Sequence, residues 1–418
     1  MYKEISKCRI CGNTNLEPLV NLGEQTLTGV FPRNRDTVIT KGPLELVKCY
    51  SHNNENVCGL VQLKHSYDSN EMYGDNYGYR SGLNQSMVRH LRGIVAEICD
   101  RMTLAEGDII IDIGGNDSTL LRSYPSDLNL NLMVIDPTSA KFSQFYPEYI
   151  RYTPDFFNAK TYNSLFRKKA KVITSIAMFY DLEEPLKFVQ DIYDVLDDEG
   201  IWVFEQSYLP FMIDTNSYDT ICHEHLEYYA IKQISWIFEK VGLKIIDINF
   251  NNVNGGSFRI TSAKDHSSLA ADNKKIKDAI DNEDRLGYNG LDIYRKFAKS
   301  VVDHKIELTN LLKSLKSDGK TILGYGASTK GNVLLQYCGI TSDDIACIAE
   351  VNEDKFGSFT PQTLIPIISE KEARAKKPDY FLVLPWHFRE GIIERENEYL
   401  KSGGKLIFPL PKIEIYSL

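Results

Sequence analysis

One stretch of this chain decides its fold: Ile109-Ile110-Ile111-Asp112-Ile113-Gly114-Gly115-Asn116-Asp117-Ser118. A β-branched run of this kind is typical of a buried strand, and a glycine at its carboxyl end lets a ligand approach the backbone. The residues after Ser118 have a helical pattern. The next strand-like run ends in Asp136, 22 positions after Gly114. We therefore expect a strand–loop–helix unit with a ligand at the loop.

The pair of glycines indicates what kind of ligand this is. A dinucleotide fingerprint needs G-x-G-x-x-G to cradle a pyrophosphate, and this loop is incomplete. A strand-Asp-x-Gly loop with a later acid better suits a nucleoside without phosphates, such as S-adenosylmethionine. Asp136 is then placed for the ribose hydroxyls, and Gly114 and Asn116 line the cofactor site. The alternative is a tight turn in a doubly wound fold whose function lies elsewhere.

Strand-like and helix-like segments alternate on both sides of this stretch. The first set of strands continues at residues 132–136, 172–176 and 201–205. A polar, Lys-rich stretch at 270–316 predicts one or two solvated helices. The alternation then resumes with strands at 321–324, 345–349, 380–384 and 405–408. This pattern predicts an α/β protein with βαβ units and two mostly parallel sheets.

Composition narrows the possible functions. The chain has 418 residues, of which 43% are hydrophobic and 25% charged, and its net charge is −9. An acidic chain argues against nucleic acid as the main partner, because that partner usually needs a basic face. No apolar run approaches the ~20 residues of a membrane helix, and the first residues show no apolar signal core. We expect a cytoplasmic protein without a membrane partner, of two or three domains.

Eight cysteines in a reducing compartment need a role other than disulfides. Four of them lie in the first 58 residues, where short segments are broken by Gly, Pro and Asn. Four thiolates complete a tetrahedral structural zinc site, and a module with so little core needs such a crosslink. The expected ligands are Cys8, Cys11, Cys49 and Cys58. His52, at Cys49-x2-His52, could replace Cys58, and the alternative is a set of buried cysteines without metal.

A second glycine loop, Gly324-Tyr325-Gly326-Ala327-Ser328-Thr329-Lys330-Gly331, also follows a strand. It is not a P-loop, because Lys330 precedes Gly331 instead of following it. Backbone N–H groups at a helix N-terminus, with a Lys and a Ser, suit a phosphate or pyrophosphate. We expect Gly326, Ser328 and Lys330 to bind such a group, helped by Lys355. A vestigial nucleotide fold is the alternative.

The densest cluster of titratable groups is the segment His223-Glu224-His225, which follows Cys222. A histidine has an ordinary pKa near 6.5 and is a natural general base at neutral pH. The segment could equally be a hydrogen-bonded structural pair. A loop rich in tyrosine, with Tyr77, Tyr79 and Arg80, predicts either an active-site lid or a hinge between domains.

These motifs occur in a specific order along nearly the whole chain. They include the Cys8/Cys11 knuckle, the loop at 77–82, Asp112-Ile113-Gly114-Gly115, Met178-Phe179-Tyr180-Asp181, His223-Glu224-His225, Asn254-Gly255-Gly256 and Gly324-Tyr325-Gly326. In this order they resemble the S-adenosylmethionine-dependent sugar C-methyltransferases, which act on nucleotide-linked deoxysugars. Two departures are the spacing of eight residues between Cys49 and Cys58, and Cys222 before the histidines.

The resemblance implies three domains. These are a zinc-binding module at 1–72, a Rossmann-like methyltransferase core at 73–252 and a second Rossmann-like domain, which helps to hold the nucleotide sugar, at 253–418. It implies S-adenosylmethionine and a structural zinc as cofactors. It also implies His225 as catalytic base, with Glu224 and a tyrosine near residue 77, either Tyr77 or Tyr79, in the pocket. Cofactor contacts are expected from Met178, Phe179 and Asp181, and sugar contacts from His223 and Asn254.

The implied reaction is methylation at C3 of a nucleotide-linked 4-keto-6-deoxysugar, typically a thymidine diphosphate sugar. His225 removes the C3 proton, and Tyr77, Tyr79 or the Asn254 loop holds the enolate oxygen. We expect a monomer or weak homo-oligomer, with zinc playing no chemical part. The rival functions are a keto-sugar epimerase, a nicotinamide-dependent nucleotide-sugar dehydrogenase and a zinc-binding adaptor without enzymatic activity.

Overall fold

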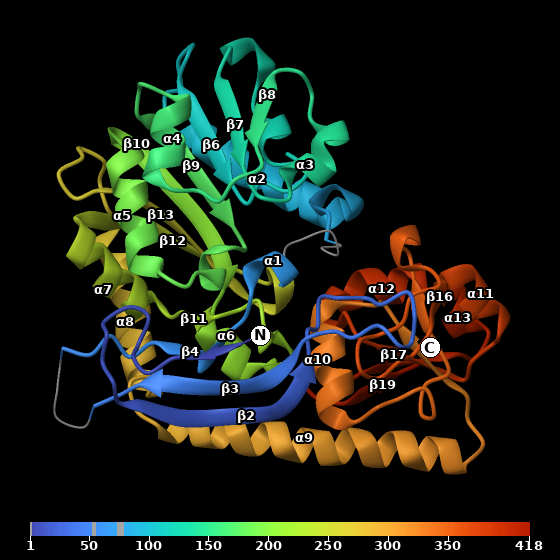
Figure 1. Cartoon of the computed structure of the whole chain (residues 1–418). Coiled ribbons are helices and arrows are strands. Elements are labelled where there is room, and N and C mark those ends of the chain that lie inside the picture. The colour runs from blue at the N-terminus through green and yellow to red at the C-terminus, as the bar shows by residue number, and fades with distance from the viewer. Residues whose placement is uncertain (1, 52–55, 73–78) are drawn as a thin grey trace.

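The computed structural model describes residues 2–51, 56–72 and 79–418, and a seven-stranded sheet lies at the centre of its first large domain (Figure 1). The strand order is β12-β13-β10-β9-β6-β7-β8. The strands are β6 (Ile109–Ile113), β7 (Asn131–Ile135), β8 (Ile150–Thr153), β9 (Ala170–Ile176), β10 (Leu196–Ser207), β12 (Leu243–Asn251) and β13 (Ser257–Lys264). Neighbours from β10 to β8 are parallel, while β13 is antiparallel to both β10 and β12. The predicted α/β fold is confirmed.

Alternate side chains of β6 enter two different cores. Ile110 packs with the apolar face of α2 (Gln85–Arg101), whereas Ile109 and Ile111 pack on the opposite face with α5 (Pro185–Val195) and α7 (Ile231–Val241). Both faces are covered, which explains why the strand is apolar at nearly every position. Shorter helices complete this domain: α3 (Ser139–Phe142), α4 (Ala159–Leu165) and α6 (Leu209–Asp214).

Strand β13 lies beyond residue 252, where we expected this domain to end. It pairs with β10 from Trp202↔Ser262 to Ser207↔Ser257, and with β12 on its other side. The chain therefore completes the first large sheet before it leaves for the C-terminal domain.

The N-terminal module is a four-stranded antiparallel sheet in the order β11-β4-β3-β2. Its own strands are β2 (Leu16–Thr26), β3 (Lys41–Cys49) and β4 (Val61–Leu63), with the short pair β1 (Lys3–Glu4) and β5 (His65–Ser66) and helix α1 (Ser69–Met72) beside them. The fourth strand, β11 (Glu227–Tyr228), comes from the segment at 73–252 that we expected to form the central domain, and it pairs with β4. The zinc-binding module and the central domain thus share a sheet.

The C-terminal domain contains a six-stranded sheet in the order β16-β15-β14-β17-β18-β19. Its strands are β14 (Ile322–Tyr325), β15 (Ile348–Glu350), β16 (Ile367–Ser369), β17 (Tyr380–Val383), β18 (Lys405–Phe408) and β19 (Glu414–Tyr416). Only β19 is antiparallel to its neighbour. Helices α10 (Thr329–Cys338), α11 (Glu370–Ala375), α12 (Arg389–Arg395) and α13 (Asn397–Lys401) accompany this sheet.

Two helices, α8 (Asn273–Leu286) and the long α9 (Asp292–Ser317), connect the large domains, as the Lys-rich stretch predicts. Figure 1 shows α9 lying along β2 and reaching the C-terminal domain. The end of β2 touches α10, because Thr26 N donates to Gln336 Oε1 at 2.8 Å and Asn332 Nδ2 donates to Thr28 O at 2.7 Å. In the described part of the chain, no helix is long and apolar enough to cross a membrane.

Candidate active site

The predicted metal ligands come together in the N-terminal module. The sulfur atoms of Cys8, Cys11, Cys49 and Cys58 all lie within 4.8 Å of one another. Cys58 belongs to this cluster, while His52 lies outside the described residues. Four thiol ligands with no carboxylate or open position among them match a closed, structural zinc site.

A cavity of about 420 Å³ opens at the carboxyl ends of β6, β9 and β10. This is the edge at which open α/β sheets place their ligands. Residues from both expected sites line it: Tyr79, Gly114, Asn116, Asp136, Met178, Asp181, Glu224, His225, Asn254 and Lys330. The predicted cofactor loop and the predicted base therefore face one space.

The cofactor loop is held in shape by Asp136. One carboxylate oxygen accepts from Asn116 N at 2.8 Å, and the other accepts from Thr138 N at 2.6 Å. Gly114 has φ +68°, a left-handed conformation that favours glycine. Met178 closes this part of the cavity, since a Cβ on Gly114 would lie 3.2 Å from its Cγ. A glycine at position 114 thus leaves the backbone of the loop accessible to a flat ligand such as adenosine.

A buried acid, Asp112, lines the same part of the cavity, and sequence analysis assigned it no role. Burial raises its pKa to about 7, and a hydrogen bond from Thr174 Oγ1 at 2.6 Å opposes that shift. A cofactor that carries an ammonium group would favour its charged form. The available signal was a single carboxylate inside an otherwise apolar strand.

Phe179 and His223 do not reach the cavity. Phe179 is fully buried and stacks on Tyr229 at a centroid distance of 5.1 Å. His223 is fully buried and packs edge-on against Tyr67 at 4.6 Å. These two side chains fill hydrophobic cores instead of lining the cavity, and their contacts with a ligand stay predictions. Tyr77 lies outside the described residues.

The second glycine loop, predicted to bind a phosphate, has most of its predicted ligand residues in contacts within the C-terminal domain. Ser328 caps α10, since its Oγ accepts from Gly331 N at 3.0 Å. Gly326 lies against the ring of Pro385, where a Cβ would be 2.6 Å from Cδ. Lys355 donates to Ala327 O at 2.8 Å, away from the cavity. Of the residues predicted there, Lys330 alone lines the cavity, and it does so beside His225.

His225 has the geometry of a general base. Its Nδ1 lies 2.8 Å from the carbonyl oxygen of Thr220, and its ring packs against Tyr180 at 4.4 Å. A carbonyl can only accept, so Nδ1 carries the proton and Nε2 keeps its lone pair. Burial, together with the positive charge of Lys330, lowers the pKa of His225 to about 3. The ring is therefore neutral at physiological pH and its Nε2 lone pair is free to accept, although the lowered pKa makes it a weaker base than a free imidazole.

Glu224, the residue before His225, also lines the cavity. A loop of the N-terminal module packs behind it so closely that a Cβ on Gly29 would lie 2.4 Å from Oε1. Burial raises the pKa of this carboxyl. The N-terminal module thus forms part of the wall that positions the predicted catalytic segment.

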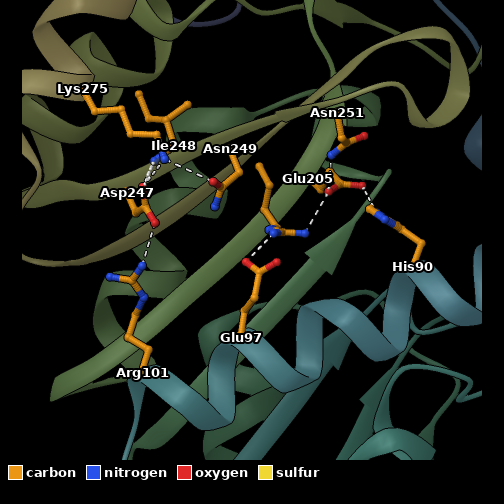
Figure 2. A network of polar contacts seen from close by, with 10 residues as sticks. His90, Glu97, Arg101, Glu205, Asp247, Ile248, Asn249, Asn251 and Lys275 are labelled. Carbon is orange, nitrogen blue, oxygen red and sulfur yellow. Dashed lines mark hydrogen bonds and ion pairs between the residues drawn. The ribbon is translucent and has the colours of Figure 1, made fainter.

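Another acid in the lining, Glu205 at the end of β10, is held by a network of polar contacts (Figure 2). Its Oε1 lies 2.5 Å from His90 Nε2, and its Oε2 accepts from Asn251 Nδ2 at 2.9 Å. Arg259 bridges this carboxylate to Glu97 on α2. Through these contacts Glu205 links α2 to strands β10, β12 and β13, and this network holds the side chain in place at the edge of the cavity.

Family models match the chain in three consecutive segments. A zinc binding domain matches residues 8–73, a methyltransferase domain matches residues 87–248 and a C-methyltransferase C-terminal domain matches residues 252–411. The chain is also 27% identical to the C-methyltransferase NovU of Streptomyces niveus, over 100% of this chain and 98% of that protein.

Solved structures resemble only part of the chain. The CurJ carbon methyltransferase matches 47% of this chain and 61% of its own, with 11% identity and a TM-score of 0.35. An O-methyltransferase family protein from Burkholderia thailandensis matches 44% of this chain and 59% of its own, with 15% identity and a TM-score of 0.33. These scores are low, so the assignment to a family rests on the domain models and the full-length relative.

Proposed function

Because this chain belongs to the methyltransferases that join a zinc binding domain to a C-methyltransferase C-terminal domain, we propose that it methylates C3 of a nucleotide-linked 4-keto-6-deoxysugar. The observation that carries this proposal is the shared cavity. It brings Gly114 and Asp136, which suit S-adenosylmethionine, together with His225, which suits proton abstraction next to a ketone. We also propose a cytoplasmic location, in keeping with eight free cysteines.

S-adenosylmethionine supplies an electrophilic methyl group on sulfur. The chain activates the acceptor carbon of the sugar: His225 Nε2 removes the proton next to the ketone, and the substrate carbanion left behind attacks the methyl. Proton transfer by a positioned side chain contributes typically 10²–10⁴-fold to a rate. The protein must also orient the sugar and the methyl donor toward each other in one cavity, and Met178 and Glu224 contribute to this orientation.

The test is a mass-spectrometric assay with a panel of 4-keto nucleotide sugars and S-adenosylmethionine. We expect one product that is heavier by a methylene group. With the methyl donor replaced by S-adenosylhomocysteine in D₂O, wild type should exchange deuterium into C3. His225→Ala should lose about 10²–10⁴-fold of both activities while it still binds the cofactor.

Other results separate the rivals. A product of unchanged mass but altered stereochemistry would indicate an epimerase. Tight NAD binding with oxidation of the sugar would indicate a dehydrogenase. Exchange at equal rates in wild type and His225→Ala would remove His225 from the role of base.

A further inference from the structure

Lys330 crosses from one domain into the active site of another. It lies in the first turn of α10, whose start at Ser328 is capped by that serine's own side chain. From there it lines the cavity of the methyltransferase domain together with His225 and Asn254. We expected this cation to bind a diphosphate, but Lys355, its predicted partner, is bonded to Ala327 O outside the cavity.

The ammonium group of Lys330 is held at a defined position. Its Nζ donates to the carbonyl oxygen of Asn254 at 2.8 Å. Asp219 provides a counter-charge: it is buried, and its Oδ2 accepts from Trp386 Nε1 at 2.8 Å. Burial lowers the pKa of Lys330, and the charge of Asp219 opposes that shift. Asp219 therefore favours the protonated lysine.

The other titratable groups near this ammonium are neutral. Burial and the positive charge of Lys330 lower the pKa of His225 and of His387 to about 3 each. Burial holds the pKa of the Cys222 thiol well above its usual value. The end of the cavity next to His225 thus holds the cation Lys330, near the carboxyl groups of Asp219 and Glu224, whose pKa values burial raises, and beside uncharged rings.

We propose that Lys330 is a catalytic residue that donates a hydrogen bond to the ketone oxygen of the substrate as negative charge develops on it. This inference rests on the function proposed above and names the group that makes its proton abstraction feasible. A neutral imidazole cannot remove a proton from carbon unless the resulting enolate is stabilised, and donors placed where charge develops are the largest single contribution in many enzymes. A lysine has three N–H donors, and a single described acceptor, Asn254 O, occupies one of them.

The donors expected from the sequence are less suitable. Gly255 N donates to Asn252 O at 3.4 Å and Gly256 N donates to Val253 O at 3.0 Å, so both amides are used within their own turn. The carbonyl oxygen of Asn254 is an acceptor, and it accepts a hydrogen bond from Lys330. The Tyr79 phenol is a neutral donor and therefore weaker than an ammonium.

The step balances as follows. The C3–H bond breaks and its proton goes to His225 Nε2, while the electron pair forms a C3–C4 double bond and moves the carbonyl pair onto O4. Lys330 stabilises that oxygen. The carbonyl then re-forms as C3 bonds to the methyl carbon, and the methyl–sulfur bond breaks with its pair left on sulfur. His225 finally releases its proton to solvent.

Lys330→Met and Lys330→Arg test this assignment, with Lys401→Met, at an exposed lysine of the same domain, as the matched control. In D₂O with S-adenosylhomocysteine, Lys330→Met should lose about 10²–10³-fold of C3 exchange, the usual effect of removing one such donor. kcat should fall in parallel, with little change in KM or in cofactor affinity. Lys330→Arg, which keeps the charge, should recover part of the exchange. Lys401→Met should exchange like wild type.

Three outcomes would overturn the proposal. Exchange at the wild-type rate in Lys330→Met would show that another group holds the oxygen. A higher KM with unchanged kcat and exchange would return Lys330 to a binding role at the diphosphate. If wild type neither exchanges nor methylates any 4-keto nucleotide sugar, the proposed function itself fails. Normal cofactor binding by calorimetry verifies that each variant is folded.

Discussion

The side chain of Asn116 joins the cofactor loop to the tyrosine loop, because its Nδ2 donates to the carbonyl oxygen of Tyr79 at 3.1 Å. Its Oδ1 also accepts from Ser81 N at 3.0 Å. The side chain of Asn116, which we predicted to contact the cofactor, thus bonds to the segment at 79–81, which lines the cavity. We therefore expect cofactor binding to be coupled to the position of Tyr79.

The first prediction concerns this coupling. Asn116→Ala should weaken S-adenosylmethionine binding by ~1–3 kcal/mol, since it leaves two backbone groups without partners. Calorimetry measures the affinity, and hydrogen exchange should show faster exchange at residues 79–83. Asn131→Ala is the control: it removes a similar bond, to Gly107 O, at the opposite edge of the sheet. Equal affinities in both variants would contradict the coupling.

The second prediction concerns zinc. Freshly purified protein should contain about one zinc per chain, and Cys49→Ala should lose the metal and lower Tm, because a structural zinc site contributes directly to folding energy. Cys99→Ala removes a cysteine outside the cluster and should keep the metal. Elemental analysis and thermal unfolding provide both readouts. Wild type that contains no zinc, and whose Tm is the same before and after treatment with a chelator, would refute the site.

The third prediction concerns Gly29, whose missing side chain leaves room for Glu224. In Gly29→Ala the carboxylate must move, because the new Cβ would lie 2.4 Å from Oε1. A displacement of about 1 Å near reacting groups can cost up to ~10²-fold in rate, so we expect turnover to fall with a small change in Tm. Gly93→Ala, on an exposed face of α2 with open space around it, is the control. It should leave turnover unchanged.

The fourth prediction concerns stability in mild acid. Burial lowers the pKa of His223 to about 3, whereas an unfolded histidine titrates near 6.5. The unfolded chain therefore binds the proton first, and stability falls as the pH drops from 6.5 towards 3. At pH 5.5 this histidine alone should cost ~1.4 kcal/mol. His223→Gln should flatten the decline measured by denaturant unfolding, while His266→Gln, at an exposed site, should follow wild type.

The strands were predictable because their signal is local. Ile109 to Ile113 is apolar at nearly every position, which a strand covered on both faces requires. The metal cluster was predictable because spacing limits where thiols can meet. Met178 and Phe179 were not separable in this way, since they are neighbours in sequence and only packing sends one to the cavity and the other to the core.

The second glycine loop shows why residue types can mislead. Serine before a helix suits an anion site, but it is also a preferred N-cap, and Ser328 takes the second role. The destination of Lys330 depends on how two domains dock, and no local pattern encodes that. The membership of β13 in the first large sheet likewise depends on a distant partner, Trp202 to Ser207 of β10.

The shared sheet between β4 and β11 has a consequence for how the chain is made. A ribosome releases the four cysteines long before Glu227 and Tyr228 emerge, so the edge of β4 at Val61 and Gln62 has no strand beside it during that interval. Unpaired strand edges of this kind recruit other chains. Metal capture by the four thiols would fix Cys58, three residues before Val61, during the time in which this edge has no partner strand.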